Sequence, residues 1–116
     1  MIFVFGSNKA GIHGAGAAKH AFESLGAEWG VGEGMTGGCY AIPTKGYNIE
    51  FLTLAEIAPS IARFIHYAED HPHLKFELTP IGCGLAGHKK SNVWKVLYDC
   101  GIPSNVYLSS TWVTDN

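Results

Sequence analysis

Short apolar runs alternate with longer mixed stretches along this chain. Four runs are rich in the aliphatic, aromatic and β-branched residues typical of strands: residues 2–5, 39–43, 74–81 and 105–108. The stretches between them predict three helices, over residues 14–25, 54–70 and 91–100. Strands that alternate with helices predict an α/β fold with a mainly parallel sheet. We expect one domain over residues 1–116, a three-layer sandwich with helices on both faces of the sheet.

Local signals mark where several of these elements begin and end. Thr53 followed by Glu56 forms a capping box, so we expect the longest helix to start at residue 54. Pro59 falls inside that helix and predicts a separate or kinked first turn. Gly26 is placed to end the preceding helix as a left-handed cap. The glycine-rich residues 28–38 predict an irregular surface loop before the second strand.

The chain carries two glycine-rich loops, FVFGSNKAGIHGAGAA at residues 3–18 and LTPIGCGLAGH at residues 78–88. Each follows an apolar run and leads toward a helix, whose N-terminus favours anions. Glycines lack the side chains that keep a backbone away from a diphosphate, and their N–H groups can converge as an anion nest. The glycines concerned are Gly14, Gly16, Gly82, Gly84 and Gly87. The loops predict a phosphate site; glycines that only form tight turns are the alternative.

Three segments are expected to meet at one edge of the sheet. In a parallel sheet, ligands bind in the crevice at the carboxyl ends of the strands. Both glycine loops follow strands, and so does the segment PTKG at residues 43–46. The sequence therefore predicts one cleft formed by all three segments. Neither loop has the spacing of a dinucleotide fingerprint or a P-loop, which argues against a dehydrogenase or a P-loop NTPase.

Composition narrows the range of partners and the environment. The formal net charge is −2 and the lysines are scattered, so no extended nucleic-acid surface is expected. No apolar stretch is long enough to span a bilayer and no leader is visible, so we expect a soluble chain without membrane partners. Three widely spaced cysteines favour reduced thiols in a cytoplasm over a disulfide framework. We expect neither a metal site nor a cofactor.

The order of these motifs resembles the macrodomains, and within them the small class of terminal ADP-ribose protein glycohydrolases and DNA ADP-ribosyl glycohydrolase antitoxins. The likeness extends from Phe3 to about Val106 and includes GSN, HGAGAA, YAIPTK and TPIGCGLAG, in that order. It implies that the loops hold the diphosphate of ADP-ribose, or of a related nucleotide, and that Asn8 lies near the ribose distal to adenine. An ADP-ribosylated macromolecule is the second implied partner. The implied ligand-binding residues are Gly6, Ser7, Asn8, His13, Gly14, Ala15, Gly16, Ala17, Thr44, Ile81, Gly82, Cys83, Gly84, Leu85, Ala86 and Gly87.

Lys45 is the residue on which catalysis depends in this resemblance. In the hydrolases, a lysine at this place attacks the anomeric carbon of the distal ribose, so Lys45 is the candidate nucleophile and has to act as a free amine. Those hydrolases also have an aspartate directly after IGCGL, where this chain has Ala86. His88, or His13 at the entry to the first loop, is the candidate to carry protons instead.

Two functions follow from these residues. The first is a hydrolase that uses Lys45 to remove ADP-ribose from a protein, nucleic acid or small molecule. The second is a catalytically silent module that binds or sequesters an ADP-ribose-like nucleotide, with Lys45 as a phosphate ligand or a surface residue. A structural α/β protein is a third reading.

The adenine end of such a ligand has no counterpart in the sequence. Larger macrodomains have an acidic residue in an N-terminal extension that contacts adenine, and no such segment precedes the first strand here. An aromatic side chain could stack on the base, but no spacing selects among Phe22, Trp29, Tyr40, Tyr47, Phe64 and Trp94.

Overall fold

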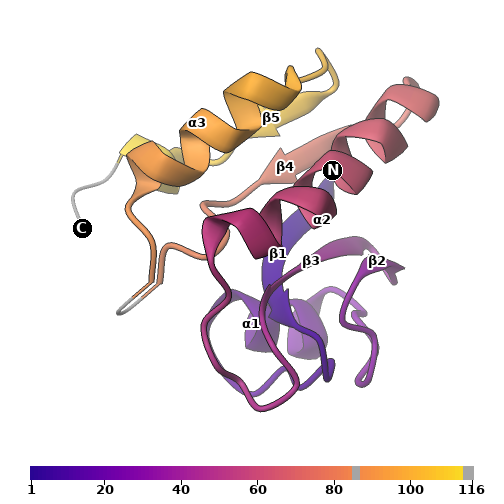
Figure 1. Ribbon diagram of the computed structural model, residues 1–116. Coiled ribbons are helices and arrows are strands. Elements are labelled where there is room, and N and C mark those ends of the chain that lie inside the picture. The colour runs from indigo at the N-terminus through magenta and orange to yellow at the C-terminus, as the bar shows by residue number, and fades with distance from the viewer. Residues whose placement is uncertain (85–86, 114–116) are drawn as a thin grey trace.

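The structure, a computed structural model, describes residues 1–84 and 87–113 of the chain. Its elements in chain order are β1 (Ile2–Asn8), α1 (Gly16–Ser24), β2 (Gly34–Thr36), β3 (Cys39–Lys45), α2 (Leu54–Asp70), β4 (Phe76–Leu78), α3 (Lys90–Cys100), β5 (Val106–Leu108) and the 3₁₀ helix η1 (Ser110–Val113). The strands form a single five-stranded sheet in the order β2-β3-β1-β4-β5 (Figure 1).

The first strand of the chain, β1, lies at the centre of the sheet. It runs parallel to β3, with Phe3 opposite Cys39, and parallel to β4, with Ile2 opposite Phe76. β5 is parallel to β4, whereas β2 pairs antiparallel with β3 at one edge. The predicted α/β fold with a mainly parallel sheet is therefore confirmed.

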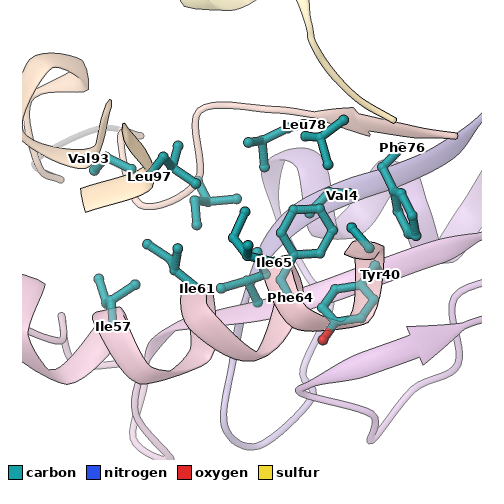
Figure 2. Close-up of a cluster of buried hydrophobic side chains, with 14 of the residues drawn as sticks. Val4, Tyr40, Ile57, Ile61, Phe64, Ile65, Phe76, Leu78, Val93 and Leu97 are labelled. Carbon is teal, nitrogen blue, oxygen red and sulfur yellow. The ribbon is translucent and has the colours of Figure 1, made fainter. Parts of the chain in front are cut away.

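Alternate residues of the central strands belong to different hydrophobic clusters. Val4, Tyr40 and Ile42 pack with buried side chains of α2 and α3, among them Phe64 and Leu97 (Figure 2). Burying a large apolar side chain of this kind contributes about 1.5–3 kcal/mol relative to leaving it exposed. This larger cluster holds α2 and α3 against one face of the sheet.

A smaller cluster lies on the opposite face, where Phe5 and Ala41 pack with Ala18 and Ala21 of α1. The small residues of α1 let the helix lie close to the strands.

Helix α1 covers only part of its face. Phe3 on this face lies in register with Glu77 of β4, which is in register with Tyr107 of β5. Glu77 is partly exposed and Tyr107 is exposed. The complete three-layer sandwich that the sequence predicts is therefore not confirmed, because β4 and β5 remain accessible to solvent on this side.

Local sequence signals at the start of α2 have mixed outcomes. The capping box is confirmed, because the Thr53 hydroxyl accepts from the Glu56 N–H at 3.2 Å and the Glu56 carboxylate accepts from the Thr53 N–H at 2.9 Å. The separate first turn expected from Pro59 is wrong, since α2 is a single helix. Ile57 and Ile61, on either side of Pro59, are both buried in the larger cluster and hold this part of the helix against the sheet.

Short elements were harder to predict. β2 lies inside residues 28–38, where the sequence predicts only an irregular loop. The strand expected over residues 74–81 is shortened to β4: after the Thr79 N–H and hydroxyl bond to the Val4 carbonyl at 3.2 and 2.6 Å, the Ile81 N–H turns back to the Thr79 carbonyl at 2.8 Å. Residues 79–81 therefore belong to the loop that follows the strand.

None of the described helices is long and apolar enough to cross a membrane. The three cysteines are free thiols: Cys39 is buried, Cys83 is partly buried and Cys100 is exposed.

Candidate functional site

The two glycine loops leave the sheet from neighbouring strands. The first follows β1 and leads to α1 on one face, while the second follows β4 and leads to α3 on the other face. Where connections leave adjacent parallel strands toward opposite faces, they leave a crevice at the carboxyl ends of the strands, and ligands of open α/β sheets bind there. The topology therefore brings both loops to the edge that the sequence predicts.

A cavity of about 190 Å³ opens at this edge. Its walls come from the end of β1, the first glycine loop, the start of α1, the end of β3 and the hairpin that follows β3. The lining residues are Gly6, Ser7, Asn8, Ile12, Gly14, Ala15, Ala18, Thr44, Lys45 and Ile49. Residues after two parallel strands thus share one cavity, and within the described residues its wall has no acidic side chain.

Two lining residues, Ile12 and Ile49, were missed from the sequence, and Ala18, at the end of the first predicted phosphate loop, was not singled out. Ala18 ends the small-residue run HGAGAA, so that run could have indicated it. Ile12 and Ile49 are apolar residues in irregular segments, and no sequence signal distinguishes them from other exposed apolar residues.

Asn8 shapes the first loop in addition to lining the cavity. Its side-chain oxygen accepts from the Ile12 N–H at 2.9 Å, and its side-chain nitrogen donates to the Ile12 carbonyl at 2.7 Å. The turn is also stabilised at Gly11, whose N–H donates to the Asn8 carbonyl at 3.0 Å. Each polar atom of the Asn8 amide therefore makes one bond within the protein, which fixes the orientation of the side chain.

Two other polar side chains on the wall also form hydrogen bonds with the protein backbone. The Ser7 hydroxyl donates to the Gly32 carbonyl, and the Thr44 hydroxyl donates to the Ser7 carbonyl at 3.3 Å. Because these hydroxyl protons are used within the protein, the donors available to a ligand are the ammonium group of Lys45, the second N–H of the Asn8 amide and backbone N–H groups of the loop. Such a wall favours an anion.

The second glycine loop lies next to Gly6 in the cavity wall but does not itself line the cavity. A Cβ at Gly6 would lie 3.2 Å from the backbone nitrogen of Gly82 and 3.2 Å from the Thr44 hydroxyl, so glycine at position 6 allows the close approach of this loop. Gly82 itself has a φ of +69°, which favours glycine. The loop then closes through a bond of 2.7 Å from the His88 N–H to the Gly82 carbonyl.

None of the described residues expected in the second loop, Gly82 and Cys83 included, lines the cavity. Ile81 is buried in the larger hydrophobic cluster, while Gly84 and Gly87 belong to the loop but do not line the cavity. Leu85 and Ala86 lie outside the described residues.

Cys83 was expected at a helix entry that favours a thiolate. Its sulfur lies 3.4 Å from the Ile81 carbonyl oxygen, and the residue packs against the larger cluster. Burial raises the pKa of the Cys83 thiol, and the charge of Lys90 lowers it by less. Cys83 is therefore a protonated thiol at neutral pH.

Lys45 lies at the end of β3, on the cavity wall. Its ammonium nitrogen is 5.0 Å from the centroid of the Phe51 ring, a distance at which the ring stabilises a positive charge. Phe51 reaches this position because residues 46–50 form a hairpin and Phe51 pairs with Lys45 as an antiparallel bridge. The hairpin thus orients the lysine.

The two candidate histidines lie away from the cavity wall. His88 Nε2 donates to the Leu52 carbonyl at 2.8 Å, which links the second loop to the segment before α2. His13 is 1% exposed, its Nε2 donates to the Glu28 carbonyl at 3.0 Å, and its ring contacts Phe5 with centroids 5.5 Å apart. His13 Nδ1 is the one buried side-chain nitrogen or oxygen in the described residues without a hydrogen-bond partner.

Two remaining candidates, Gly16 and Ala17, begin helix α1 and are exposed beside the cavity without lining it. Within the described residues, no three side chains of His, Cys, Asp or Glu come together as a metal site requires.

A second cavity, of about 270 Å³, lies between α3, β5 and η1. It is lined by Lys90, Ser91, Trp94, Leu108 and Trp112. The two indole rings have centroids 6.1 Å apart, and the Trp112 Nε1–H donates to the Leu78 carbonyl at 2.8 Å, which fixes that ring. Since Leu108 ends β5, this cavity also lies at the carboxyl edge of the sheet.

Comparisons with protein-family models, curated proteins and solved structures found no match for this chain. Function therefore has to be inferred from the geometry of the chain itself.

Proposed function

We propose that this chain binds ADP-ribose or a closely related nucleotide at the carboxyl edge of its sheet, as the macrodomains that it resembles do. The observation that carries the proposal is the cavity shared by Asn8, Gly14, Ala15 and Lys45, which come from separate segments after two parallel strands. A macrodomain-like three-layer arrangement is part of this proposal.

The chemistry of the cavity wall supports an anionic ligand. Lys45 is its one described basic side chain and no described acidic side chain opposes it. Phe51 stabilises the positive charge of Lys45, and Gly14 leaves the loop backbone open to a diphosphate. Apolar residues such as Ile12 and Ile49 complete the wall, a mixture typical of small-molecule sites.

The base of the nucleotide is assigned to the second cavity, against the partly exposed ring of Trp94, which the edge-to-face contact with Trp112 holds in place. Residues of the second glycine loop lie near both cavities. Gly82 lies beside Gly6 in the wall of the first cavity, and the His88 N–H bonds to the Gly82 carbonyl. Lys90, in the wall of the second cavity, follows His88 by two residues, a span of at most about 7 Å between their Cα atoms. Indole rings offer flat apolar surfaces on which a base stacks.

Hydrolysis through Lys45 is the second candidate function, favoured by the position of Lys45 on the same wall as Asn8. The amine nitrogen would form a bond to the anomeric carbon of the distal ribose while the bond to the leaving group breaks and that group takes up a proton. His88, the candidate from the sequence, does not line the cavity and bonds to the Leu52 carbonyl, so water would supply this proton. A second water would then bond to the anomeric carbon as the bond to the lysine nitrogen breaks, which releases ADP-ribose and the free amine. Binding without turnover has the stronger support, because the charge on Lys45 is stabilised by Phe51 and no described carboxylate lines the cavity.

Calorimetric titration with ADP-ribose tests the proposal, with tryptophan emission as a second signal and mass spectrometry of the incubated ligand. We expect 1:1 binding without metal and quenched emission. For a binding module, Lys45→Ala should weaken binding by about 1.5–3 kcal/mol, the value of a hydrogen bond to a charged group. Lys45→Arg should retain more affinity because it keeps the charge.

The same variants separate the two functions. A hydrolase would release ADP-ribose from an ADP-ribosylated peptide or DNA, and both Lys45→Ala and Lys45→Arg would abolish the release while binding persists. Lys75→Ala is the matched control, because Lys75 is exposed just before β4, at the opposite edge of the sheet. Absence of binding to folded parent protein would refute the proposed function.

A further inference from the structure

Ile49 has an unusual backbone conformation for its residue type. Its φ is +63°, and it is the single non-glycine residue with a positive φ in the part of the chain that the structure describes. In this left-handed region the Cβ atom crowds the backbone, and a β-branched side chain is especially disfavoured. Glycine and asparagine adopt the same conformation with less strain.

The hairpin around Ile49 explains the conformation but does not require isoleucine. The Gly46 N–H donates to the Glu50 carbonyl at 2.9 Å, and the Ile49 N–H donates to the Gly46 carbonyl at 3.1 Å. The Glu50 carboxylate also accepts from the Asn48 N–H at 3.0 Å. These are backbone bonds, or bonds from side chains other than that of residue 49. Glycine or asparagine would preserve all of them.

Core packing does not require isoleucine at this position either. Ile49 is 40% exposed and belongs to neither of the two hydrophobic clusters. Its place is on the wall of the first cavity, together with Asn8, Ile12 and Lys45. A branched apolar side chain is thus kept in a strained conformation at the candidate site, where strain is commonly maintained for function.

We infer that Ile49 is a specificity-determining residue, whose side chain packs against the carbon face of the sugar attached to the diphosphate. This inference rests on the proposed function and names the part of the ligand that the cavity selects. The hydroxyls of Ser7 and Thr44 use their protons on carbonyls of the protein, so toward the sugar they offer acceptor oxygens only, and the side chain of Ile49 is placed to cover its carbon face. The cavity therefore selects a diphosphate that carries a distal ribose over one that ends in phosphate.

The test compares ADP-ribose with ADP, which has the same base, ribose and diphosphate but lacks the distal sugar. Kd is measured by calorimetry for both ligands with the parent protein, Ile49→Gly and Ile49→Asn. We expect the parent to prefer ADP-ribose and the ratio of the two Kd values to fall about tenfold or more in both variants. Both variants should melt at or above the temperature of the parent, because the strain is relieved.

Tyr47→Ala is the matched control, since Tyr47 belongs to the same hairpin but is 71% exposed and does not line the cavity. Its Kd ratio should equal that of the parent. An unchanged ratio in Ile49→Gly, or a lower melting temperature with both affinities retained, would refute the inference and assign Ile49 a role in hairpin stability alone. Equal binding of ADP and ADP-ribose by the parent would also refute it while leaving nucleotide binding intact. Failure of both ligands to bind would refute it together with the proposed function.

Discussion

The two glycine loops have similar compositions but are stabilised in different ways. In the first, a side chain determines the turn, because both polar atoms of the Asn8 amide bond to the backbone of Ile12. In the second, the backbone closes on itself through the bond from His88 to Gly82. Among the described residues, the first loop lines the cavity and the second only borders it. Glycine content therefore predicts turns in both loops, but it does not distinguish the loop that lines the cavity from the loop that only borders it.

Each loop contains glycines that the fold requires and one that it does not. A Cβ at Gly11 would collide with the backbone of Gly30, and a Cβ at Gly87 would collide with backbone oxygens of its own loop. Gly14 and Gly84 have open space around them and no positive φ. Neither packing nor backbone conformation requires glycine at these two positions, so a larger side chain there tests the proposed approach of a ligand without disturbing the fold.

The largest expected effect separates the two kinds of glycine in the first loop. Gly11→Ala should lower the free energy of unfolding by about 2–4 kcal/mol, because it adds a collision to a left-handed conformation with a φ of +69°. Gly14→Ala, the matched control, should change it by less than about 0.5 kcal/mol. Urea denaturation measures both, and equal stabilities would show that packing does not distinguish these glycines.

A smaller effect, on affinity, compares the open glycines of the two loops. Gly14→Val and Gly84→Val should both fold with nearly the stability of the parent, since both positions have free space. Gly14→Val should weaken ADP-ribose binding about tenfold or more, equal to about 1.4 kcal/mol, because Gly14 lines the cavity. Gly84→Val should weaken it less. If Gly84→Val binds as tightly as the parent, the second loop does not contact the ligand.

The smallest effect concerns the thiol of the second loop. Since burial raises the pKa of Cys83, a smaller fraction of this thiol is ionised at any given pH than in an ordinary cysteine. Alkylation of Cys83 in a Cys100→Ser variant should therefore be slow at pH 7 and accelerate only above about pH 8.5, the ordinary value. Urea-denatured protein provides the reference rate. Faster labelling in the folded protein at pH 7 would indicate a thiolate stabilised at the helix entry.

Much of the fold could be predicted because local chemistry determines it. The capping box of Thr53 and Glu56 starts α2, and Gly26, with a φ of +82°, follows the end of α1 as expected. β2 could not be predicted, because its three residues, Gly34–Thr36, become a strand only by pairing with β3. A pairing partner distant in sequence leaves no local pattern in so short a segment.

The candidate site was predictable in its backbone and less so in its side chains. The sequence indicated that Asn8, Gly14 and Lys45 would converge, because they follow parallel strands. It did not indicate that the Asn8 amide bonds to a neighbouring backbone, or that His13 is buried among aromatic rings. These outcomes depend on residues that meet only after folding, so periodicity and motif spacing do not report them.

The central position of β1 has a consequence for the order in which the molecule assembles. β1 pairs on one side with β3 and on the other with β4, so Ile2 cannot find its partner Phe76 until the more than seventy residues between them have been synthesised. Contacts between residues so far apart in sequence slow folding. A fragment that ends before Phe76 would leave a hydrophobic strand with one unpaired edge, a template for aggregation. Both edges of β1 are thus paired only after β3 and β4, which come later in the chain, have been made.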